Sequence, residues 1–350
     1  MTAIVSLAVL ILAIYILAVI TDEFFVKSLE QISQVWKIPP SVAGASLMAM
    51  GSSAPELFIA MLALFKDGGA NSDVGIGTIV GSAVFNILVI TGISAVIRDA
   101  KVTLPAIVRD TVFYLISIGF LLYAFWDGQI VLSESILFIV IYGGYLAFLF
   151  LVPMGDEFEE PAKTEEKLSD TKEESRLQLV NRAITKNVGY LTGDAEKDYI
   201  RAFLASIFLI GALSWVLVDS AVIFANALGI PPVIIALTIL AGGTSAPDLI
   251  ASVIVARQGQ GSMAVANAIG SNIFDILICL GLPWTIALLF LDRGTILVGT
   301  GELLLSVFIL VSTVVVLFIF LYTGRVLTRR EGWCLLGFYA TYILWTVFVG

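Results

Sequence analysis

The sequence predicts an all-α membrane protein with ten transmembrane helices, arranged as two inverted repeats of five helices each. Three observations lead to this prediction. The 350 residues are 59% hydrophobic and only 13% charged, which is far less charge than a soluble chain of this length carries. The chain contains ten apolar runs of membrane-spanning length. Five of these runs precede a single polar stretch and five follow it, with matching motifs in the two sets.

The apolar runs divide the chain into three parts. We expect a first five-helix repeat at 1–152, a charged linker at 153–201 and a second five-helix repeat at 202–350. The linker mixes both charges, so we expect a solvated tether with some helix rather than a calcium-sensing segment. No small-residue cleavage pattern follows the first run, which we therefore interpret as a span and not as a signal peptide. The predicted spans are 2–21, 40–65, 73–97, 107–126, 132–152, 202–226, 231–256, 263–287, 296–322 and 332–349.

The orientation of the two halves follows from their helix number. Because five is odd, the second set of helices enters the membrane from the opposite side, which makes the repeat inverted. With the linker in the cytoplasm, 17 of the 19 Lys and Arg residues lie on the cytoplasmic side, and only Lys66 and Arg293 lie on the other. We therefore expect a multi-pass protein of the cell membrane, plasma or inner, with both termini extracytoplasmic.

One motif occurs in the second span of each half. It reads GASLMAMGSSAPELF at 44–58 and ALTILAGGTSAPDLI at 236–250. In each copy a proline interrupts the helix, because proline lacks an N–H group and clashes with the carbonyl group four residues earlier. The freed carbonyl groups, expected at Gly51 and Gly243, are candidate cation ligands where the backbone lines a cavity. A carboxylate follows each proline, and a carboxylate within a membrane span is costly and usually functional.

The third span of each half carries a second pair of polar residues, within GTIVGSAVFNILVITG at 77–92 and ANAIGSNIFDILICLG at 266–281. Their i, i+4 spacing puts each pair on one face of a helix. Together the motifs supply three carboxylates, one side-chain amide and six hydroxyl groups. The candidate cation ligands are Glu56, Asp248, Asp275, Asn86, Ser52, Ser53, Thr244, Ser245, Ser82 and Ser271.

This all-oxygen set suits a hard cation, and the chain has no histidine for a transition-metal site. Ca2+ takes about six to eight oxygen ligands that include carboxylates, whereas Mg2+ tends to keep its waters. The three carboxylates carry a charge of about −3, which is too costly to leave uncompensated near the bilayer centre. One Ca2+ with one K+, three Na+, or one Ca2+ with a protonated carboxyl group would each neutralise it. A site that accepts one such set at a time meets the requirement for an antiporter.

The motifs GSSAPELF, GTIVGSAVFNIL, GTSAPDLIASVIVAR and IGSNIFDI resemble the two alpha-repeats of the cation/calcium exchanger superfamily. Together with DEFF at 22–25 and VAGAS at 42–46, they are similar to its potassium-dependent sodium/calcium exchanger branch. The resemblance covers both halves and leaves the linker outside. It implies a ten-helix exchanger that moves Na+ one way and Ca2+ the other, with the first and sixth spans as sliding gates.

The resemblance also implies roles for individual residues. Glu56 and Asp248 would be the principal Ca2+ carboxylates. An acidic residue at the place of Asp275 is associated with K+ coupling, so K+ is a third expected ion; potassium-independent relatives often carry Asn there, although some prokaryotic members keep Asp. The remaining candidates would be neighbouring ligands for Na+ and Ca2+, namely Ser52, Ser53, Thr244, Ser245, Ser82, Ser271 and Asn86.

Other functions fit the sequence less well. The runners-up are a K+-independent Na+/Ca2+ exchanger and a Ca2+/H+ exchanger that use the same carboxylates. A cation channel would need a continuous pore, whereas a twinned inverted site suits alternating access. An intramembrane protease would need a GxGD pair, a Ser with His, or HExxH, and the chain has no histidine. We expect no cofactor, no enzymatic activity and no nucleic-acid partner; the pattern specifies no oligomeric state.

Two further expectations concern side chains outside the motifs. Both cysteines lie in apolar runs and are expected to be buried free thiols. Four tryptophans lie near predicted span ends and are expected to form an interfacial belt. These residues are Cys279, Cys334, Trp126, Trp284, Trp333 and Trp345.

Overall fold

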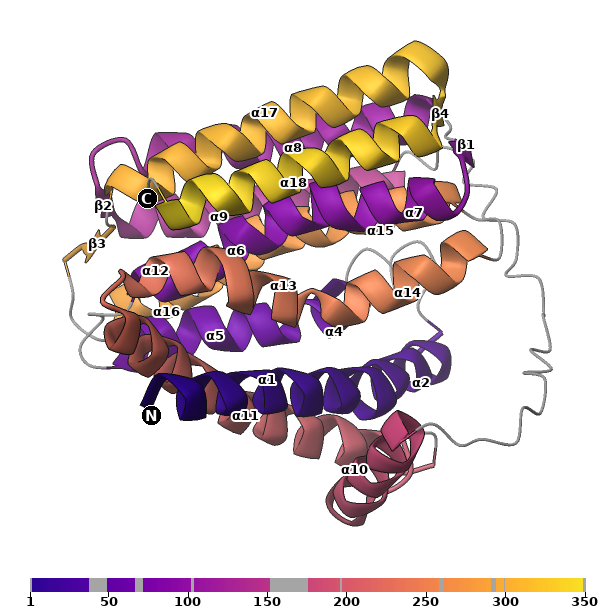
Figure 1. Cartoon of the computed structure of the whole chain (residues 1–350), viewed down its shortest axis with the longest axis vertical. Coiled ribbons are helices and arrows are strands. Elements are labelled where there is room, and N and C mark those ends of the chain that lie inside the picture. Colours follow the sequence, from indigo (N-terminus) through magenta and orange to yellow (C-terminus); the bar gives the residue numbers. More distant parts are fainter. Residues whose placement is uncertain are drawn as a thin grey trace.

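The computed structural model describes residues 2–37, 49–66, 72–101, 104–151, 176–195, 197–257, 261–290, 294–298 and 300–348. Within these ranges most residues are helical, and the helices lie side by side (Figure 1). Six of the described helices are long and apolar enough to cross a membrane, and the bent pair Pro232–Thr244 and Ala246–Val253 would make a seventh. The predicted class, an all-α polytopic membrane protein, is confirmed, and the count of ten spans stays a prediction.

The helices of the first half follow the predicted spans. The first is longer than predicted, because α1 (Thr2–Ile20) continues through the π-helical segment η1 (Thr21–Val26) into α2 (Lys27–Val35). The second predicted span begins in residues outside the described ranges. The other elements are α4 (Ala49–Ser52), α5 (Ala54–Phe65), α6 (Ser72–Phe85), η4 (Asn86–Ile90), α7 (Thr91–Ile97), α8 (Leu104–Ala124) and α9 (Leu132–Leu151).

The second half has a corresponding series of helices. Before it comes α10 (Arg176–Thr192), which is helical as expected for part of the linker and packs against α1 and α11. The elements after it are α11 (Tyr199–Leu228), α12 (Pro232–Ile235), η5 (Ala236–Leu240), α13 (Ala241–Thr244), α14 (Ala246–Arg257), α15 (Gly261–Phe274), η6 (Asp275–Leu280), α16 (Gly281–Phe290), α17 (Thr300–Gly324) and α18 (Arg329–Phe348).

Short antiparallel strand pairs join the two halves at both ends of the molecule. Strand β1 (Ala100–Lys101) pairs with β4 (Val326–Leu327), and β2 (Gln129–Ile130) pairs with β3 (Ile296–Leu297). Figure 1 shows both chain ends on the side of β2 and β3, while β1, β4 and α10 lie on the opposite side. The two termini therefore share one side of the helix layer, as an even number of crossings requires.

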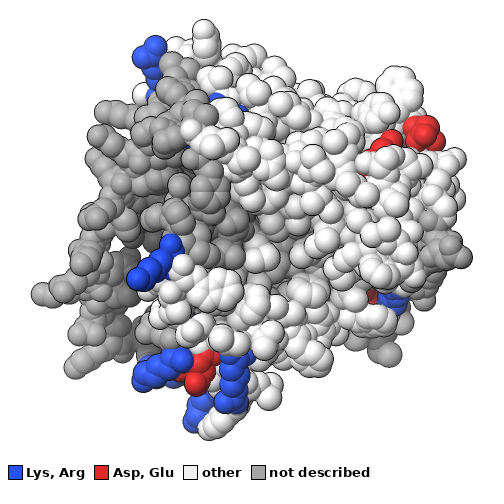
Figure 2. All heavy atoms as spheres, turned by 180° about the vertical axis from the view of Figure 1, so that it is seen from behind, with Lys and Arg blue, Asp and Glu red and all other residues white. Residues whose placement is uncertain are grey.

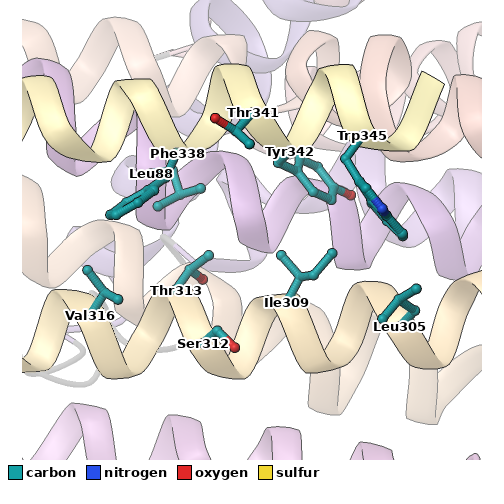
Figure 3. A pocket seen from close by; sticks show the side chains of 10 residues that line it. All are labelled: Leu88, Leu305, Ile309, Ser312, Thr313, Val316, Phe338, Thr341, Tyr342 and Trp345. Carbon is teal, nitrogen blue, oxygen red and sulfur yellow. The ribbon is translucent and has the colours of Figure 1, made fainter. Parts of the chain in front are cut away.

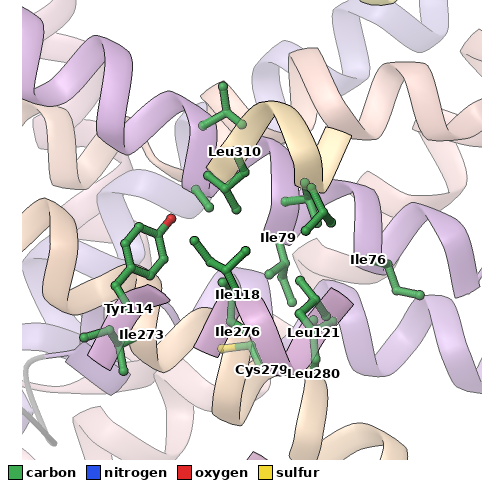
Figure 4. Close-up of a cluster of buried hydrophobic side chains, with 14 of the residues drawn as sticks. Ile76, Ile79, Tyr114, Ile118, Leu121, Ile273, Ile276, Cys279, Leu280 and Leu310 are labelled. Carbon is green, nitrogen blue, oxygen red and sulfur yellow. The ribbon is translucent and has the colours of Figure 1, made fainter. Parts of the chain in front are cut away.

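The main hydrophobic core surrounds α6 and the η6 region. Side chains from α6, α8, α15, η6 and α17 meet there, among them Ile79, Ile118 and Leu310 (Figure 4). A second core joins α1, α2, α5 and α11, and in Figure 1 α1 and α11 form a layer at one side of the molecule. The α1–α11 layer thus packs against α5 and η5 through this second apolar core.

The outer surface is apolar over broad areas, as expected for helices in contact with lipid. Figure 2 shows mostly uncharged atoms across the visible face, with Lys and Arg gathered toward its margins. Exposed large hydrophobic side chains occur along the lengths of α1, α11 and α17, for example Ile11, Phe208 and Phe308.

Two expectations about single side chains were wrong. Trp284 is 2% exposed and packs edge-on against Phe125 and Phe138, so it belongs to the core and not to an interfacial belt. Cys334 is an exposed free thiol on α18, whereas Cys279 is buried as expected. An apolar run predicts that a residue lies in a span, but not whether it faces lipid or protein.

Candidate cation-binding site

The two proline motifs form matching helix breaks. Helix α4 ends at Ser52 and α5 begins at Ala54, with Ser53 between them in a turn. Helix α13 likewise ends at Thr244, and α14 begins at Ala246. Since proline lacks an N–H group, it is tolerated near the start of a new helix but not within one. The break in each half therefore follows from its proline.

Each break places a carboxylate in the first turn of the following helix. Glu56 lies in the first turn of α5, and Asp248 lies in the first turn of α14. Backbone N–H groups at a helix start carry a partial positive charge that stabilises a nearby anion. Both carboxylates are buried within the protein and do not extend toward an interface.

The second pair of motifs adopts a matching irregularity. Helix α6 passes into the π-helical segment η4 at Asn86, and α15 passes into η6 at Asp275. Segments of π-helix are rare and often lie at functional sites. Residues that the sequence aligns between the halves thus begin the same kind of local distortion. All ten predicted ligands lie in the described ranges, and nine of them are buried, the exception being the half-buried Ser52.

A hydrogen-bonded pair of serines joins the two halves at the site. Ser82 Oγ lies 2.6 Å from Ser245 Oγ and donates to Glu56 Oε1 at 3.4 Å. Ser245 then donates its own proton to Ser82, because a hydroxyl group has only one proton to give. Thr244, also from the second half, lies beside the same Glu56 carboxylate. Glu56 is therefore surrounded by hydroxyl groups from both halves.

The other two carboxylates have different neighbours. Asp248 lies beside Ser52 of the first half and Asn267 of its own half. Asp275 lies beside Ser53, and Cys279 Sγ is 3.7 Å from both Asp275 Oδ1 and the Ser53 carbonyl oxygen. Each carboxylate of the second half thus lies against the α4–α5 break of the first.

Several oxygen atoms of the site have no protein partner. Within the described residues, Ser53 Oγ, Glu56 Oε2 and Asn86 Oδ1 are buried and make no hydrogen bond. Buried oxygen atoms without partners are uncommon in native structures and call for an explanation such as an ion. A cation bound against any of these oxygens would supply the missing partner.

The charge of the site is likewise uncompensated. The negative charges of Glu56 and Asp248 repel each other, and both repel the negative charge of Asp275. The ion pairs in the described part of the chain are Lys27–Glu23, Lys66–Asp219 and Arg109–Asp110, and none includes a site carboxylate. Buried anions without a protein cation are neutralised by a bound cation or by a proton.

The carboxylates do not form a compact cluster by themselves. Among the described residues no group of three or more His, Cys, Asp and Glu side chains is arranged to hold a metal ion. Any cation bound in this arrangement would therefore take hydroxyl, amide or backbone oxygens beside a carboxylate, as hard cations commonly do.

Four residues at the site were not among the predicted ligands: Asn267, Asn272, Tyr114 and Cys279. Asn272 directly follows Ser271 and lies three residues before Asp275, so an amide within an apolar motif was a usable signal. Cys279 lies one turn after Asp275, which was also a usable signal. Tyr114 gives no such signal, because its sequence neighbourhood in α8 is an ordinary apolar helix.

A cavity of 510 Å3 lies elsewhere, between α17 and α18 (Figure 3). Its walls include Ile309, Val316 and Phe338, and none of its lining residues is acidic. Leu88 of η4 also borders it, two residues after Asn86. This groove lacks the charge that a cation site needs.

The family profile described as sodium/calcium exchanger protein matches residues 5–151 and 199–348, which are most of the chain. Human sodium/potassium/calcium exchanger 4 is 28% identical over 96% of this chain and 79% of its own length. Human sodium/potassium/calcium exchanger 5 is 30% identical over 92% of this chain and 79% of its own length.

Solved structures share the fold. The sodium-calcium exchanger NCX_Mj aligns with a TM-score of 0.60 at 21% identity, over 98% of both chains. The H+/Ca2+ exchanger CAX aligns with a TM-score of 0.69 at 13% identity, over 98% of this chain and 81% of that one. The chain belongs to the sodium/calcium exchanger family of the cation/calcium exchanger superfamily, on the side of the potassium-dependent branch.

Proposed function

We propose that this antiporter exchanges Na+ for Ca2+ by alternating access, with K+ moving together with Ca2+. Two buried carboxylates, Glu56 and Asp248, would hold Ca2+, and Asp275 would supply the third negative charge. The remaining proposed ligands are Asn86, Ser52, Ser53, Thr244, Ser245, Ser82 and Ser271. The observation that carries the proposal is the contact between halves: Glu56 lies among hydroxyl groups from both, with one carboxylate oxygen unpaired.

Such a contact supports alternating access for a physical reason. The ligands come from two halves of the molecule, so a movement of one half relative to the other would change the geometry of the site. The α1–α11 layer meets α5 and η5 through an apolar core distinct from the main one, and an apolar interface suits a layer that slides over the rest. Sliding would open the site to one side and then to the other.

The chemistry of the site supports competition between two sets of ions. Three carboxylates need about three positive charges, which one Ca2+ with one K+ or three Na+ would supply. Both sets would use the same buried oxygens, so they would bind alternately. An antiporter requires this exclusion, because simultaneous binding would allow no exchange.

Two observations favour K+ as the third ion. The second half carries a buried carboxylate, Asp275, where the first half carries the neutral Asn86. Exchangers 4 and 5 named above are sodium/potassium/calcium exchangers. A third carboxylate gives the site charge for a monovalent cation beside Ca2+.

We also propose that residues 1–152 and 202–350 are the two inverted repeats and that 153–201 is a cytoplasmic linker. The location of both termini on one side, opposite α10, supports this arrangement. With α10 in the cytoplasm, both termini would be extracytoplasmic. A cysteine introduced beside either terminus would then react with a membrane-impermeant maleimide in intact cells, and one introduced in α10 would not.

The deciding experiment is 45Ca2+ uptake into Na+-loaded proteoliposomes, with external K+ present or replaced by choline. We expect wild-type uptake to require both the Na+ gradient and K+. Asp275→Asn should retain Na+-driven uptake and lose the K+ requirement. Asp219→Asn, which removes an exposed carboxylate paired with Lys66, is the matched control and should behave as wild type.

Each other outcome points to a different function. Na+-driven uptake that ignores K+ would make the chain a K+-independent exchanger. Uptake driven only by a pH gradient would make H+ the counter-ion. Ca2+ flux without any counter-ion would indicate a channel and would contradict the proposal.

A further inference from the structure

We propose that Asn272 is a positioning residue that fixes the side-chain amide of Asn86, so that its carbonyl oxygen is the atom left free for a cation. Asn272 is not itself a proposed ligand. This inference rests on the proposed function and concerns how the site is held in shape.

One of the atoms that Asn272 contacts can only accept a hydrogen bond. Asn272 Nδ2 lies 3.2 Å from the backbone carbonyl oxygen of Ala83. A carbonyl oxygen only accepts hydrogen bonds, so the Asn272 atom facing it must be the amide nitrogen. Asparagine oxygen and nitrogen are otherwise hard to distinguish, and a backbone anchor of this kind decides between them.

The orientation of Asn272 then decides that of Asn86. Asn272 Nδ2 also donates to the Tyr114 hydroxyl group at 3.0 Å, which uses its second proton. Its Oδ1 accepts from Asn86 Nδ2 at 2.9 Å. If the Asn86 amide were turned around, two oxygen atoms would face each other in a buried site, which is strongly unfavourable.

The second proton of the Asn86 amide is also used. Asn86 Nδ2 donates to Ser271 Oγ at 3.3 Å, and Ser271 donates in turn to the Ala268 carbonyl oxygen at 3.4 Å. Every N–H of both amides thus has an acceptor. Asn86 Oδ1 is left buried and without a partner in the described part of the chain.

The network also breaks the symmetry of the repeat. Asn272 occupies the position in the second half that Ala83 occupies in the first. The amide is therefore present in one half only, and it reaches across to orient the ligand of the other half. Asn86, Asn272 and Tyr114 are all fully buried, so no water competes with this arrangement.

Two substitutions of Asn272 distinguish a role in orienting the Asn86 amide from a role in stabilising the fold alone. Asn272→Leu removes the acceptor that holds Asn86, whereas Asn272→Asp keeps an acceptor oxygen at that place and loses the donors to Ala83 and Tyr114. Both variants should lose thermal stability, because each leaves buried polar groups unpaired. Only the Leu variant should lose the orientation of Asn86.

The experiment measures Ca2+ affinity by calorimetry in detergent and the KM and maximal rate of Na+-driven Ca2+ uptake in proteoliposomes, using the full chain. Asn272→Leu should weaken Ca2+ binding about tenfold and raise KM equally, with a maximal rate within about twofold of wild type. Asn272→Asp should bind Ca2+ at least as tightly as wild type, because it also adds a negative charge.

Tyr114→Phe provides a milder test that keeps the ring and removes only the hydroxyl group. It should weaken Ca2+ binding by about threefold, since Asn272 keeps its backbone anchor. Tyr342→Phe is the matched control, because Tyr342 is also buried and its hydroxyl group lies outside the network. It should bind Ca2+ as wild type does.

Three results would overturn the inference. The first is wild-type affinity in Asn272→Leu, and the second is an equal loss of affinity in the Leu and Asp variants. The third result applies if neither Asn272 variant folds, and it is an equal Ca2+ affinity of the Tyr114→Phe and Tyr342→Phe variants. Failure of the wild-type protein to exchange Na+ for Ca2+ would instead contradict the proposed function, while the calorimetry would still report on the network.

Discussion

The two halves present different side chains at the same structural position. Asn86 begins η4 in the first half, and Asp275 begins η6 in the second. The Asn86 amide gives both protons to acceptors in the second half, whereas Asp275 lies beside a thiol and the Ser53 turn. The difference shows that a repeated backbone can carry an unequal charge, with one carboxylate from the first half and two from the second.

The two halves also share one pair of carboxylates. Glu56 and Asp248 occupy equivalent positions after equivalent helix breaks, and both are buried. The unequal residues lie on the neighbouring helices. Under the proposed function, Glu56 and Asp248 would balance a divalent cation, and the unequal pair would decide whether a monovalent cation accompanies it.

The largest effect is expected when the shared charges are removed. Glu56→Gln and Asp248→Asn should each lower Na+-driven 45Ca2+ uptake by at least about 100-fold, because each takes away half of the charge facing a divalent cation. Asp219→Asn, whose carboxylate pairs with Lys66 outside the site, should keep near-normal uptake. If either amide variant retained more than about a tenth of wild-type uptake, the two positions would not be the principal carboxylates.

Much of what the two halves share at the site could be predicted from the sequence. Repeated prolines, each followed by a carboxylate, indicated two helix breaks with an acidic residue at the start of the next helix, and the structure has both. Apolar runs also predicted the helices closely, because length and hydrophobicity are local properties of a chain. The alignment of Asn86 with Asp275 came from the repeat itself.

The partners across the two halves could not be predicted in the same way. Helical spacing puts Ser82 and Asn86 on one face, but it does not show that Ser82 meets Ser245 or that Asn86 meets Asn272. Such contacts depend on how two distant helices pack. The wrong expectation for Trp284 has the same origin, since its burial depends on Phe125 and Phe138 from elsewhere in the chain.

A second test pushes the halves apart instead of changing their charge. A Cβ atom at Gly81 of α6 would lie 2.5 Å from the Leu237 carbonyl oxygen and 2.8 Å from the Ala241 Cβ, both in the second half. Gly81→Ala should therefore destabilise the protein by about 1–3 kcal/mol, as overpacked cores do. Thermal unfolding in detergent measures this loss.

The control for Gly81→Ala is Gly119→Ala in α8. A Cβ atom there would meet nothing within 4 Å among the described residues. Alanine also favours the helix over glycine, so the melting temperature should stay the same or rise slightly. Equal melting temperatures for the two variants would mean that α6 and the second half are not held in close contact at this point.

The smallest effect is expected from the hydroxyl pair that joins the halves. Ser82→Ala and Ser245→Ala should each weaken Ca2+ binding several-fold, because each leaves the other hydroxyl group without its partner, at a cost of about 1 kcal/mol. Ser117→Ala is the control, since Ser117 is equally buried and, among the described residues, bonds only the Phe113 carbonyl oxygen of its own helix. Calorimetric titration with Ca2+ measures all three variants.

The double variant Ser82→Ala with Ser245→Ala decides whether the halves act together. If the 2.6 Å contact couples them, the double variant should lose no more affinity than the weaker-binding single variant, which gives a coupling energy of about 1 kcal/mol. Additive losses would mean that each serine serves the cation on its own. The two halves would then contribute ligands independently, and the difference between Asn86 and Asp275 would be a matter of charge alone.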